Sequence, residues 1–311
     1  MADIDVERMK SIVLAAIKAR GPDPRFVAPR RSTADNREVR KLLAPLLEKA
    51  ALDPAALEPT IEPEDARPSA EAIADAARRH ALMKAGVVKT MKARVARQQD
   101  AAARPIVPVN PPPITEFLQP FLILSEPATI LSASNLAPDD NWAQLSFQSG
   151  ADYGGYYVNF WYYWTNPTDV PMGIDVDTSV GFVGYCSVKA GSFGGVSNAH
   201  ISASMKILPA DVQNGSTPVT TPIIPVLNLH AGSWFSGVFN AAPVNSTVDV
   251  SNDQVIVAGG ATVIFEVFAS FVFDNADGAF GSKSYAVFDF DSGYEISNPG
   301  MTLIATPWIL V

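Results

Sequence analysis

Apolar residues recur every three to four positions through roughly the first hundred residues, and farther along the chain they alternate with polar ones. In IDVERMKSIVLAAIKARG the apolar side chains fall on one face of a helix, which Gly21 can cap. In HISASMKI, residues 200–207, every second side chain is apolar, as in a strand with one buried face. The two periods predict a helical segment followed by a β-segment.

Two further helices are expected before the change of period. Residues 32–50 carry leucines at helical spacing, and Pro45 is expected to kink or divide that helix. After a loop rich in proline and acid, a long helix is expected from Ser69 to about Ala103, with its apolar stripe through Ile73, Val87 and Val95. These segments predict an N-terminal helical domain.

The second segment predicts about ten short strands separated by turn residues. Besides residues 200–207, strands are expected near 121–133, 143–148, 156–165, 179–189, 222–230, 246–250, 284–290 and 301–310. Residues 255–273 are expected to form two strands joined as a tight hairpin at Gly259-Gly260, because glycine readily adopts positive φ. The predicted fold is α+β in two segments, a helical domain followed by an antiparallel β-sandwich or jelly roll.

Composition and charge change at the same place as the periodicity. From Ile106 to Val311 there is no arginine, and three lysines stand against 17 acidic residues, which gives a charge of −14. The first 105 residues carry +5, so the two parts sum to the net charge of −9. We therefore divide the chain into a basic helical domain at 1–105, a proline-rich linker at 106–113 and an acidic β-domain at 114–311.

The stretch YYVNFWYYW, residues 156–164, is the first candidate for a binding surface. Alternation places Tyr156, Phe160, Tyr162 and Trp164 on one face, which we expect in the core. The opposite face carries the candidate ligand-binding residues Tyr157, Asn159, Trp161 and Tyr163. If exposed, this face could stack on sugar rings; if the helical domain or a neighbouring subunit covers it, the stretch is structural.

The third helix carries a run of basic residues without an acidic one between Asp75 and Asp100. The candidate docking residues are Arg78, Arg79, Lys84, Lys89, Lys92, Arg94 and Arg97. Docking onto the acidic β-domain, of the same chain or of a neighbouring copy, is the favoured interpretation, and an anionic membrane surface is the alternative. Nucleic acid is disfavoured, since the acidic β-domain would be repelled by a phosphate backbone.

Acidic residues gather at the expected turns, and one group has a spacing suited to calcium. Asp289, Asp291 and Glu295 surround Gly293 and could supply oxygen ligands. The alternative is ordinary turn chemistry, in which Asp, Asn and Gly are common. Apart from this candidate calcium site, no cofactor is expected.

No catalytic motif is present, and the chain is interpreted as non-enzymatic. His80, His200 and His230 do not complete a metal-ligand spacing, and Cys186 falls on an apolar strand face, as a buried thiol would. The carboxylate pairs Asp175/Asp177 and Asp289/Asp291 leave a glycosidase as an alternative. Neither a signal peptide nor a long apolar span is apparent, so a cytoplasmic location or export without a signal is expected.

The leading hypothesis is a structural, assembly or recognition protein that self-associates or binds another protein. A carbohydrate-binding, lectin-like module with a glycan ligand is one alternative, carried by the aromatic face of residues 156–164. A membrane-active or toxin-like protein is the other, carried by the basic amphipathic helix.

Overall fold

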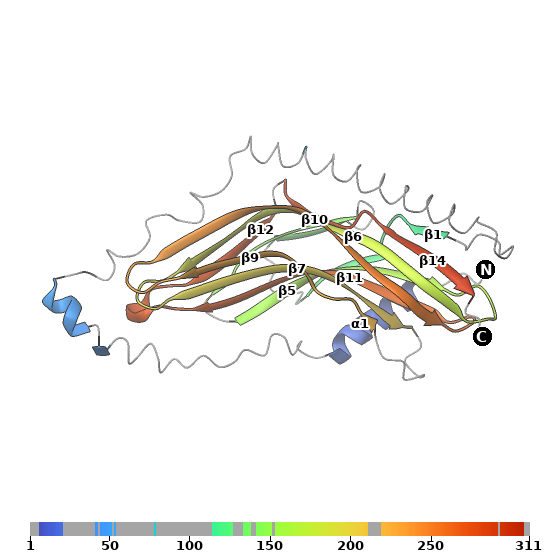
Figure 1. The fold of residues 1–311 in the computed structure, drawn as a ribbon, viewed down its shortest axis with the longest axis horizontal. Helices are drawn as coiled ribbons and strands as arrows, with labels where there is room; N and C mark the ends of the chain where they lie inside the picture. Colours follow the sequence, from blue (N-terminus) through green and yellow to red (C-terminus); the bar gives the residue numbers. More distant parts are fainter. Residues whose placement is uncertain are drawn as a thin grey trace.

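The computed structural model describes residues 6–20, 41–42, 44–51, 53, 78, 114–126, 133–137, 141–150, 153–210, 219–291 and 293–307. In this part of the chain, two antiparallel sheets pack face to face into an elongated sandwich (Figure 1). The antiparallel sandwich predicted from the alternation is confirmed. Its finer assignment as a jelly roll stays a prediction.

Sheet A contains eight of the described strands. They are β1 (Ile114–Phe117), β3 (Ala133–Ala137), β4 (Trp142–Gln148), β6 (Met172–Ala190), β10 (Val238–Val257), β12 (Tyr285–Phe290), β13 (Glu295–Ser297) and β14 (Met301–Pro307). The long strand β6 pairs with β10 along one edge and with β14, β13 and β12 in succession along the other. β6 therefore organises the whole sheet.

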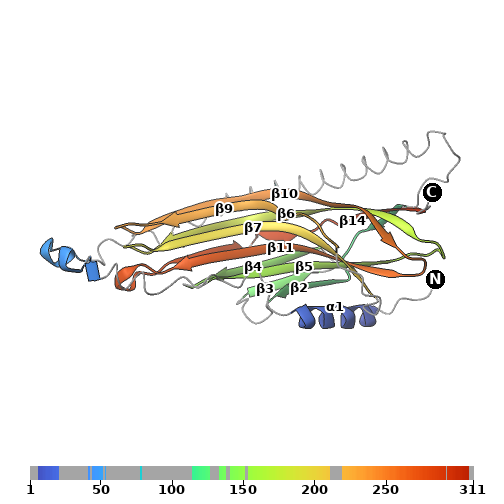
Figure 2. The ribbon, with the colours of Figure 1, turned by 60° about the horizontal axis from the view of Figure 1, so that its bottom comes forward.

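Sheet B contains six of the described strands. They are β2 (Leu122–Glu126), β5 (Tyr153–Thr165), β7 (Val196–Pro209), β8 (Val219–Thr220), β9 (Ile224–Gly232) and β11 (Thr262–Ala276). β11 lies at the centre, paired with β5 on one side and β7 on the other. Figure 2 shows the two layers edge on, with the helix α1 (Val6–Arg20) below the strands β2 and β5.

The long strands of the second segment repeatedly change sheet. The chain passes from β5 in sheet B to β6 in sheet A and back to β7, and the same exchange recurs at β9–β10–β11–β12. The connections therefore arch over the two ends of the sandwich, and each end is made of loops that are distant in sequence.

The turn at Gly259-Gly260 is present, but the hairpin expected there is wrong. The turn is closed by a hydrogen bond from the Ala261 amide to the Ala258 carbonyl (3.1 Å), and Gly260 has φ 69°. However, β10 pairs with β6 in sheet A, whereas β11 pairs with β5 and β7 in sheet B. The exposed turn therefore carries the chain from one sheet to the other at the end of the sandwich instead of closing a two-stranded ladder.

Aromatic side chains dominate the interior between the sheets. The Phe271 ring of β11 makes edge-to-face contacts with Phe182, Phe288 and Phe290 of sheet A, at centroid separations of 5.2–6.3 Å. The inner face of β5, with Tyr156, Phe160, Tyr162 and Trp164, belongs to the same core, as the alternation predicted. Such pairs add about 0.5–1.5 kcal/mol each to the burial of their area.

Little of the expected helical domain lies among the described residues. α1 is present, and residues 44–49 form a second short helix that packs through Leu47. The first described strand begins at Ile114, but the boundaries at 105 and 113 fall outside the described residues and stay predictions.

Candidate functional sites

The outward face of β5 holds the four predicted ligand-binding residues, and α1 covers part of it. Trp161 is 0% exposed and packs with Met9 and Val13 of α1 and with Ile264 of β11. The helical spacing of Met9 and Val13 brings both onto this contact, because residues four apart lie on one helix face. The indole nitrogen of Trp161 has no hydrogen-bond partner among the described residues.

The other three predicted residues surround this contact. Asn159 is buried and donates a hydrogen bond from Nδ2 to Oε1 of Glu126 (2.7 Å). Tyr157 and Tyr163 are half-buried and make edge-to-face contacts with Phe268 and Phe121, at 5.7 and 5.3 Å. With α1 in place, Trp161 and Asn159 are not accessible to a stacked sugar, so the glycan hypothesis stays a prediction that requires α1 to leave.

We refer to this surface as the helix-docking face. It consists of Phe121, Leu122, Leu124, Trp161, Tyr163, Leu208, Ala210 and Ile264. Its apolar residues come from β2, β5, β7 and β11 and from the adjoining Phe121 and Ala210, and the buried Glu266 of β11 stands opposite Trp161 in the strand register. A sheet face of this kind must be covered by another element, and α1 supplies the cover.

The predicted basic docking residues lie almost wholly outside the described part of the chain. Arg78 is exposed and helical, and it has an interaction partner. Arg79, Lys84, Lys89, Lys92, Arg94 and Arg97 are outside the described residues. Docking through this set stays a prediction.

The three predicted calcium ligands are not gathered into one site. Asp289 is buried near the end of β12, its Oδ1 accepting a hydrogen bond from the Asp291 amide (3.3 Å), and Glu295 begins β13. No group of three His, Cys, Asp or Glu residues that could hold a metal ion occurs among the described residues. The calcium hypothesis therefore gains no geometric support and stays a prediction.

The titratable residues considered for catalysis have structural surroundings. His200 and His230 point outward, as predicted, and Nδ1 of each lies 2.7 and 2.6 Å from Oδ1 of Asn228 and Asn198, respectively. Cys186 is fully buried, as predicted, and burial raises the pKa of its thiol to about 12. A thiol with this pKa is protonated at neutral pH and is a poor nucleophile.

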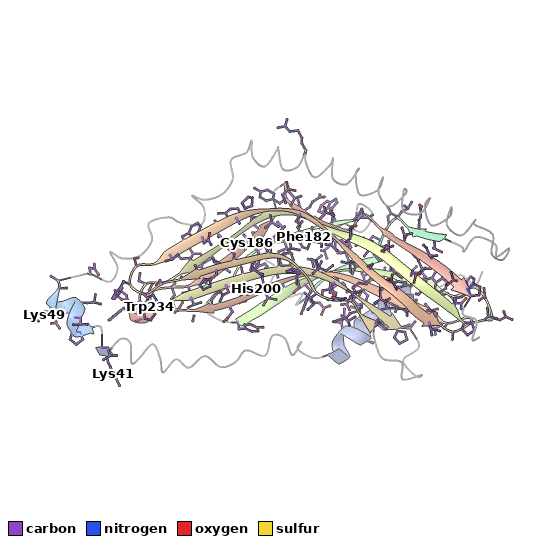
Figure 3. All side chains as sticks on the ribbon, in the orientation of Figure 1. Lys41, Lys49, Phe182, Cys186, His200 and Trp234 are labelled. Carbon is purple, nitrogen blue, oxygen red and sulfur yellow. The ribbon has the colours of Figure 1, made fainter. Side chains whose placement is uncertain are left out.

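A second apolar surface, which was not predicted from the sequence, lies at one end of the sandwich. We define the distal tip as the three arches at residues 191–195, 233–237 and 277–284. Trp234 is 87% exposed and Phe235 is 62% exposed, and Figure 3 places Trp234 at this end. The signal in the sequence was AGSWFSG, two adjacent aromatic residues between small ones, in a stretch without Asp, Glu, Lys or Arg from Val212 to Val248.

Hydrogen bonds join the three arches of the distal tip into one unit. The amides of Phe193 and Gly194 donate to the carbonyls of Phe235 and Ser233, and the Ala279 amide donates to the Phe193 carbonyl. Ser284 adds a side-chain contact, since its Oγ accepts a hydrogen bond from the Gly191 amide (2.9 Å). The arches are therefore held in a fixed arrangement.

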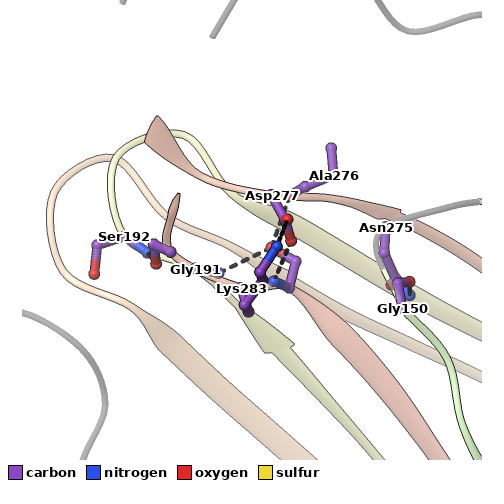
Figure 4. A network of polar contacts seen from close by, with 9 residues as sticks. Gly150, Gly191, Ser192, Asn275, Ala276, Asp277 and Lys283 are labelled. Carbon is purple, nitrogen blue, oxygen red and sulfur yellow. Dashed lines mark hydrogen bonds and ion pairs between the residues drawn. The ribbon is translucent and has the colours of Figure 1, made fainter. Parts of the chain in front are cut away.

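An ion pair closes the third arch (Figure 4). Lys283 Nζ lies 2.8 Å from Oδ2 of Asp277, and Oδ1 of Asp277 accepts a hydrogen bond from the Ser284 amide. The hydrogen bond that Lys283 Nζ donates to Asp277 raises the pKa of Lys283, and the negative charge of Asp277 raises it further. Asp277 thus closes the turn by accepting the Ser284 amide and also neutralises the charge of Lys283.

None of the described helices combines the length and the apolar character that crossing a bilayer requires.

Comparisons with known proteins give no family for this chain. No family model matches it, and no curated protein matches it. A solved structure of a CocE/NonD family hydrolase from Staphylococcus aureus is 9% identical, with a TM-score of 0.20, over 64% of this chain and 37% of that one.

Two further structures come from infectious bursal disease virus. The structure of the Gt strain is 12% identical with a TM-score of 0.14, over 65% of this chain and 45% of that one. That of derived T=1 particles is 14% identical with a TM-score of 0.15, over 65% and 43%. The chain spans less than half the length of each of these three proteins, and scores this low transfer neither fold nor function to it.

Proposed function

We propose that this chain is a non-enzymatic assembly or recognition protein, in which the β-sandwich is a rigid scaffold and N-terminal helices are the docking elements. The scaffold part rests on the extensive aromatic core between the two sheets. The docking part rests on α1, which is seated on the helix-docking face.

The contact between α1 and Trp161 is the observation that supports this proposal. α1 ends at Arg20 and β1 begins at Ile114, so 93 residues separate the helix from the sandwich that it covers. A connection of that length spans up to roughly 300 Å when extended, which is enough to reach the same sandwich or that of a neighbouring copy. Between copies, the same contact would join subunits.

The nature of the contact separates two ways of assembling. Met9 and Val13 meet Trp161 and Ile264 through apolar atoms, so association through α1 should persist as salt rises. Association of the basic third helix with an acidic sandwich should weaken as salt rises, because ions screen it. The salt dependence of any assembly therefore reports which helix carries it.

The test is the mass of the full chain in solution at low and moderate salt, measured by sedimentation for the wild type, Val13→Asp and Leu14→Asp. Val13 is buried where α1 contacts the sandwich, and Leu14 of the same helix is exposed, so the second variant is the matched control. We expect a wild-type oligomer that Val13→Asp dissociates and Leu14→Asp leaves intact. A wild type that is monomeric at every concentration and salt level would overturn the assembly role.

A further inference from the structure

The distal tip exposes two adjacent large aromatic side chains, Trp234 and Phe235. Trp234 is the most exposed of the large hydrophobic residues, and Phe235 follows it directly. Isolated exposed apolar residues are ordinary, but adjacent aromatic residues at the end of a molecule indicate an interaction site.

These side chains stand on a preformed base. The Phe235 ring packs edge to face on buried Phe193 at 6.3 Å, and Phe193 packs in the same way on Phe280 at 5.3 Å. Phe193 and Phe280 both have positive φ, 59° and 65°, which an L-residue adopts only when its surroundings impose it. Binding through Trp234 would therefore involve little ordering of the loop beneath it.

The short helix at residues 44–49 extends the same surface. Leu47 packs on Phe193 and Ala279, which fixes this helix against the distal tip. Leu42 and Leu46 are mostly exposed, and the exposed lysines Lys41 and Lys49 stand beside them (Figure 3). Apolar side chains from two separate segments thus gather at one end, with Lys41, Glu48 and Lys49 around them.

Charge is distributed unevenly along the long axis. Five carboxylates lie near the opposite end, where β6 begins and β10 ends: Asp169, Asp175, Asp177, Asp249 and Asp253. At 3.3 Å per residue they are roughly 40–70 Å from the distal tip, several Debye lengths at physiological salt. The arch that carries Trp234 belongs to the uncharged stretch 212–248, so bringing it to an apolar phase desolvates no formal charge.

We propose that the distal tip docks onto the surface of a lipid bilayer, with Trp234 and Phe235 at the boundary between headgroups and acyl chains and Leu42 and Leu46 beside them. Tryptophan favours that boundary, and lysines reach from it to the headgroups. A bilayer fits better than a protein partner, because the apolar residues project from the end of the molecule on separate segments and need no complementary shape. The proposal is independent of the assembly role.

The test is co-sedimentation of the full chain with phosphatidylcholine vesicles, with a second set that also contains phosphatidylserine. We expect binding to both, and a loss of roughly tenfold or more in partitioning for Trp234→Ser/Phe235→Ser, because two exposed aromatic surfaces are removed. Leu118→Ser is the matched control, since Leu118 is 71% exposed away from the tip, and it should bind like the wild type.

Tryptophan fluorescence gives a readout specific to the site. Of the five tryptophans, Trp161 and Trp164 are buried, Trp142 is half-buried and Trp308 lies outside the described residues. Trp234 is 87% exposed, so vesicles should shift the wild-type emission to shorter wavelength. Trp234→Phe should keep the binding and lose most of that shift. A loss of binding without a change in the thermal melting curve would exclude misfolding as its cause.

Three outcomes would overturn the proposal. Absence of binding to either vesicle set excludes a lipid partner. If binding requires phosphatidylserine and is unchanged in Trp234→Ser/Phe235→Ser, a basic segment and not the distal tip contacts the vesicle. If the double variant Trp234→Ser/Phe235→Ser instead changes the solution mass of the protein and leaves vesicle binding unaffected, the tip is a contact between copies of the chain. None of these results would by itself bear on the α1 contact.

Discussion

At the residue scale, glycines set the spacing of the arches in the distal tip. A Cβ at Gly278 would lie 1.8 Å from the Ser192 carbonyl oxygen, and one at Gly195 would lie 2.2 Å from the Gly191 carbonyl oxygen. Both obstacles are backbone atoms, which cannot turn away as a side chain can. The lack of a side chain at Gly278 lets two arches approach closely, and the lack of one at Gly195 lets the arch at 191–195 close on itself.

Gly278→Ala should destabilise the protein by about 1–3 kcal/mol, because the added methyl group must push two arches apart. Gly150→Ala is the control, since nothing lies within 4 Å of a Cβ there. Chemical denaturation of both variants measures the difference. If the two variants are equally stable, the arches can separate without loss of stability, and the distal tip is not held in a fixed arrangement.

The buried thiol of Cys186 should make stability fall at alkaline pH. Burial raises its pKa from the ordinary value of 9.0 to about 12, so the folded state keeps its proton where the unfolded state has lost it. The stabilisation is complete below pH 9 and is lost progressively up to about pH 12, at a rate of at most about 1.4 kcal/mol per pH unit. Urea titrations across this range measure the fall.

Cys186→Ala should show a shallower alkaline loss than the wild type. The remaining slope comes from buried tyrosines, because burial also raises the pKa of Tyr162 and of Tyr185. Identical slopes for the two proteins would mean that the thiol ionises as readily in the folded state as in the unfolded one.

At the element scale, the arches that change sheet depend on side-chain caps. Asn166 follows β5 and is buried beside the turn between β10 and β11. Its Nδ2 lies 2.8 Å from the Val170 carbonyl and 3.1 Å from those of Val257 and Ala258, and its Oδ1 accepts the Thr168 amide and hydroxyl. One side chain thus ties together two arches.

Asn166→Ala should lower the free energy of unfolding by roughly 1–3 kcal/mol, because buried carbonyls lose their donor. Thr168→Val, which removes only the hydroxyl bonds to Asn166 and Val170, should cost clearly less. Thermal melting with a two-state fit compares the two. If Thr168→Val destabilises the protein as much as Asn166→Ala does, the bonds from Asn166 to the carbonyls of Val170, Val257 and Ala258 contribute little to stability.

Elements of the fold differ in how far their sequence could predict them. The alternation in β5 correctly divided its residues between core and outer face, because one-residue steps reverse the side-chain direction. The pairing of β10 and β11 was wrong, because a Gly-Gly turn specifies a reversal but not which sheet each strand joins. The cover over Trp161 was left open, since a contact between Val13 and Ile264 depends on tertiary packing alone.

The distal tip was missed for a related reason. AGSWFSG shows two adjacent aromatic residues between small ones, but the sequence does not tell whether their side chains are exposed or buried. Their exposure follows from the arch at 233–237, which turns at the end of the sandwich between strands of different sheets. Candidate sites made of a single segment can be recognised in the sequence, whereas the distal tip is made of three segments that only the fold brings together.

At the scale of the whole molecule, acidic charge collects at the end opposite the distal tip. Asp175 and Asp177 lie two residues apart on one face of β6, and Ser251 pairs opposite Asp177 in β10, between Asp249 and Asp253 along that strand. Ser179 donates a hydrogen bond to Asp249 (2.8 Å), but no lysine or arginine occurs in residues 169–179 or 245–257. Like charges at this spacing repel one another.

Sodium chloride should therefore stabilise the fold. Raising it from about 10 mM to about 150 mM shortens the Debye length from about 30 Å to about 8 Å, which screens repulsion between neighbouring strands. We expect a gain of about 0.5–1 kcal/mol in the free energy of unfolding, measured by calorimetry at pH 7 as a rise in Tm.

Asp253→Asn should raise the low-salt Tm and reduce the salt effect, since it removes one of the repelling charges. Asp277→Asn, the same substitution within the ion pair to Lys283, should instead lower Tm. A Tm that falls with salt would show that attraction between unlike charges, and not repulsion at the acidic end, dominates the electrostatics of the molecule.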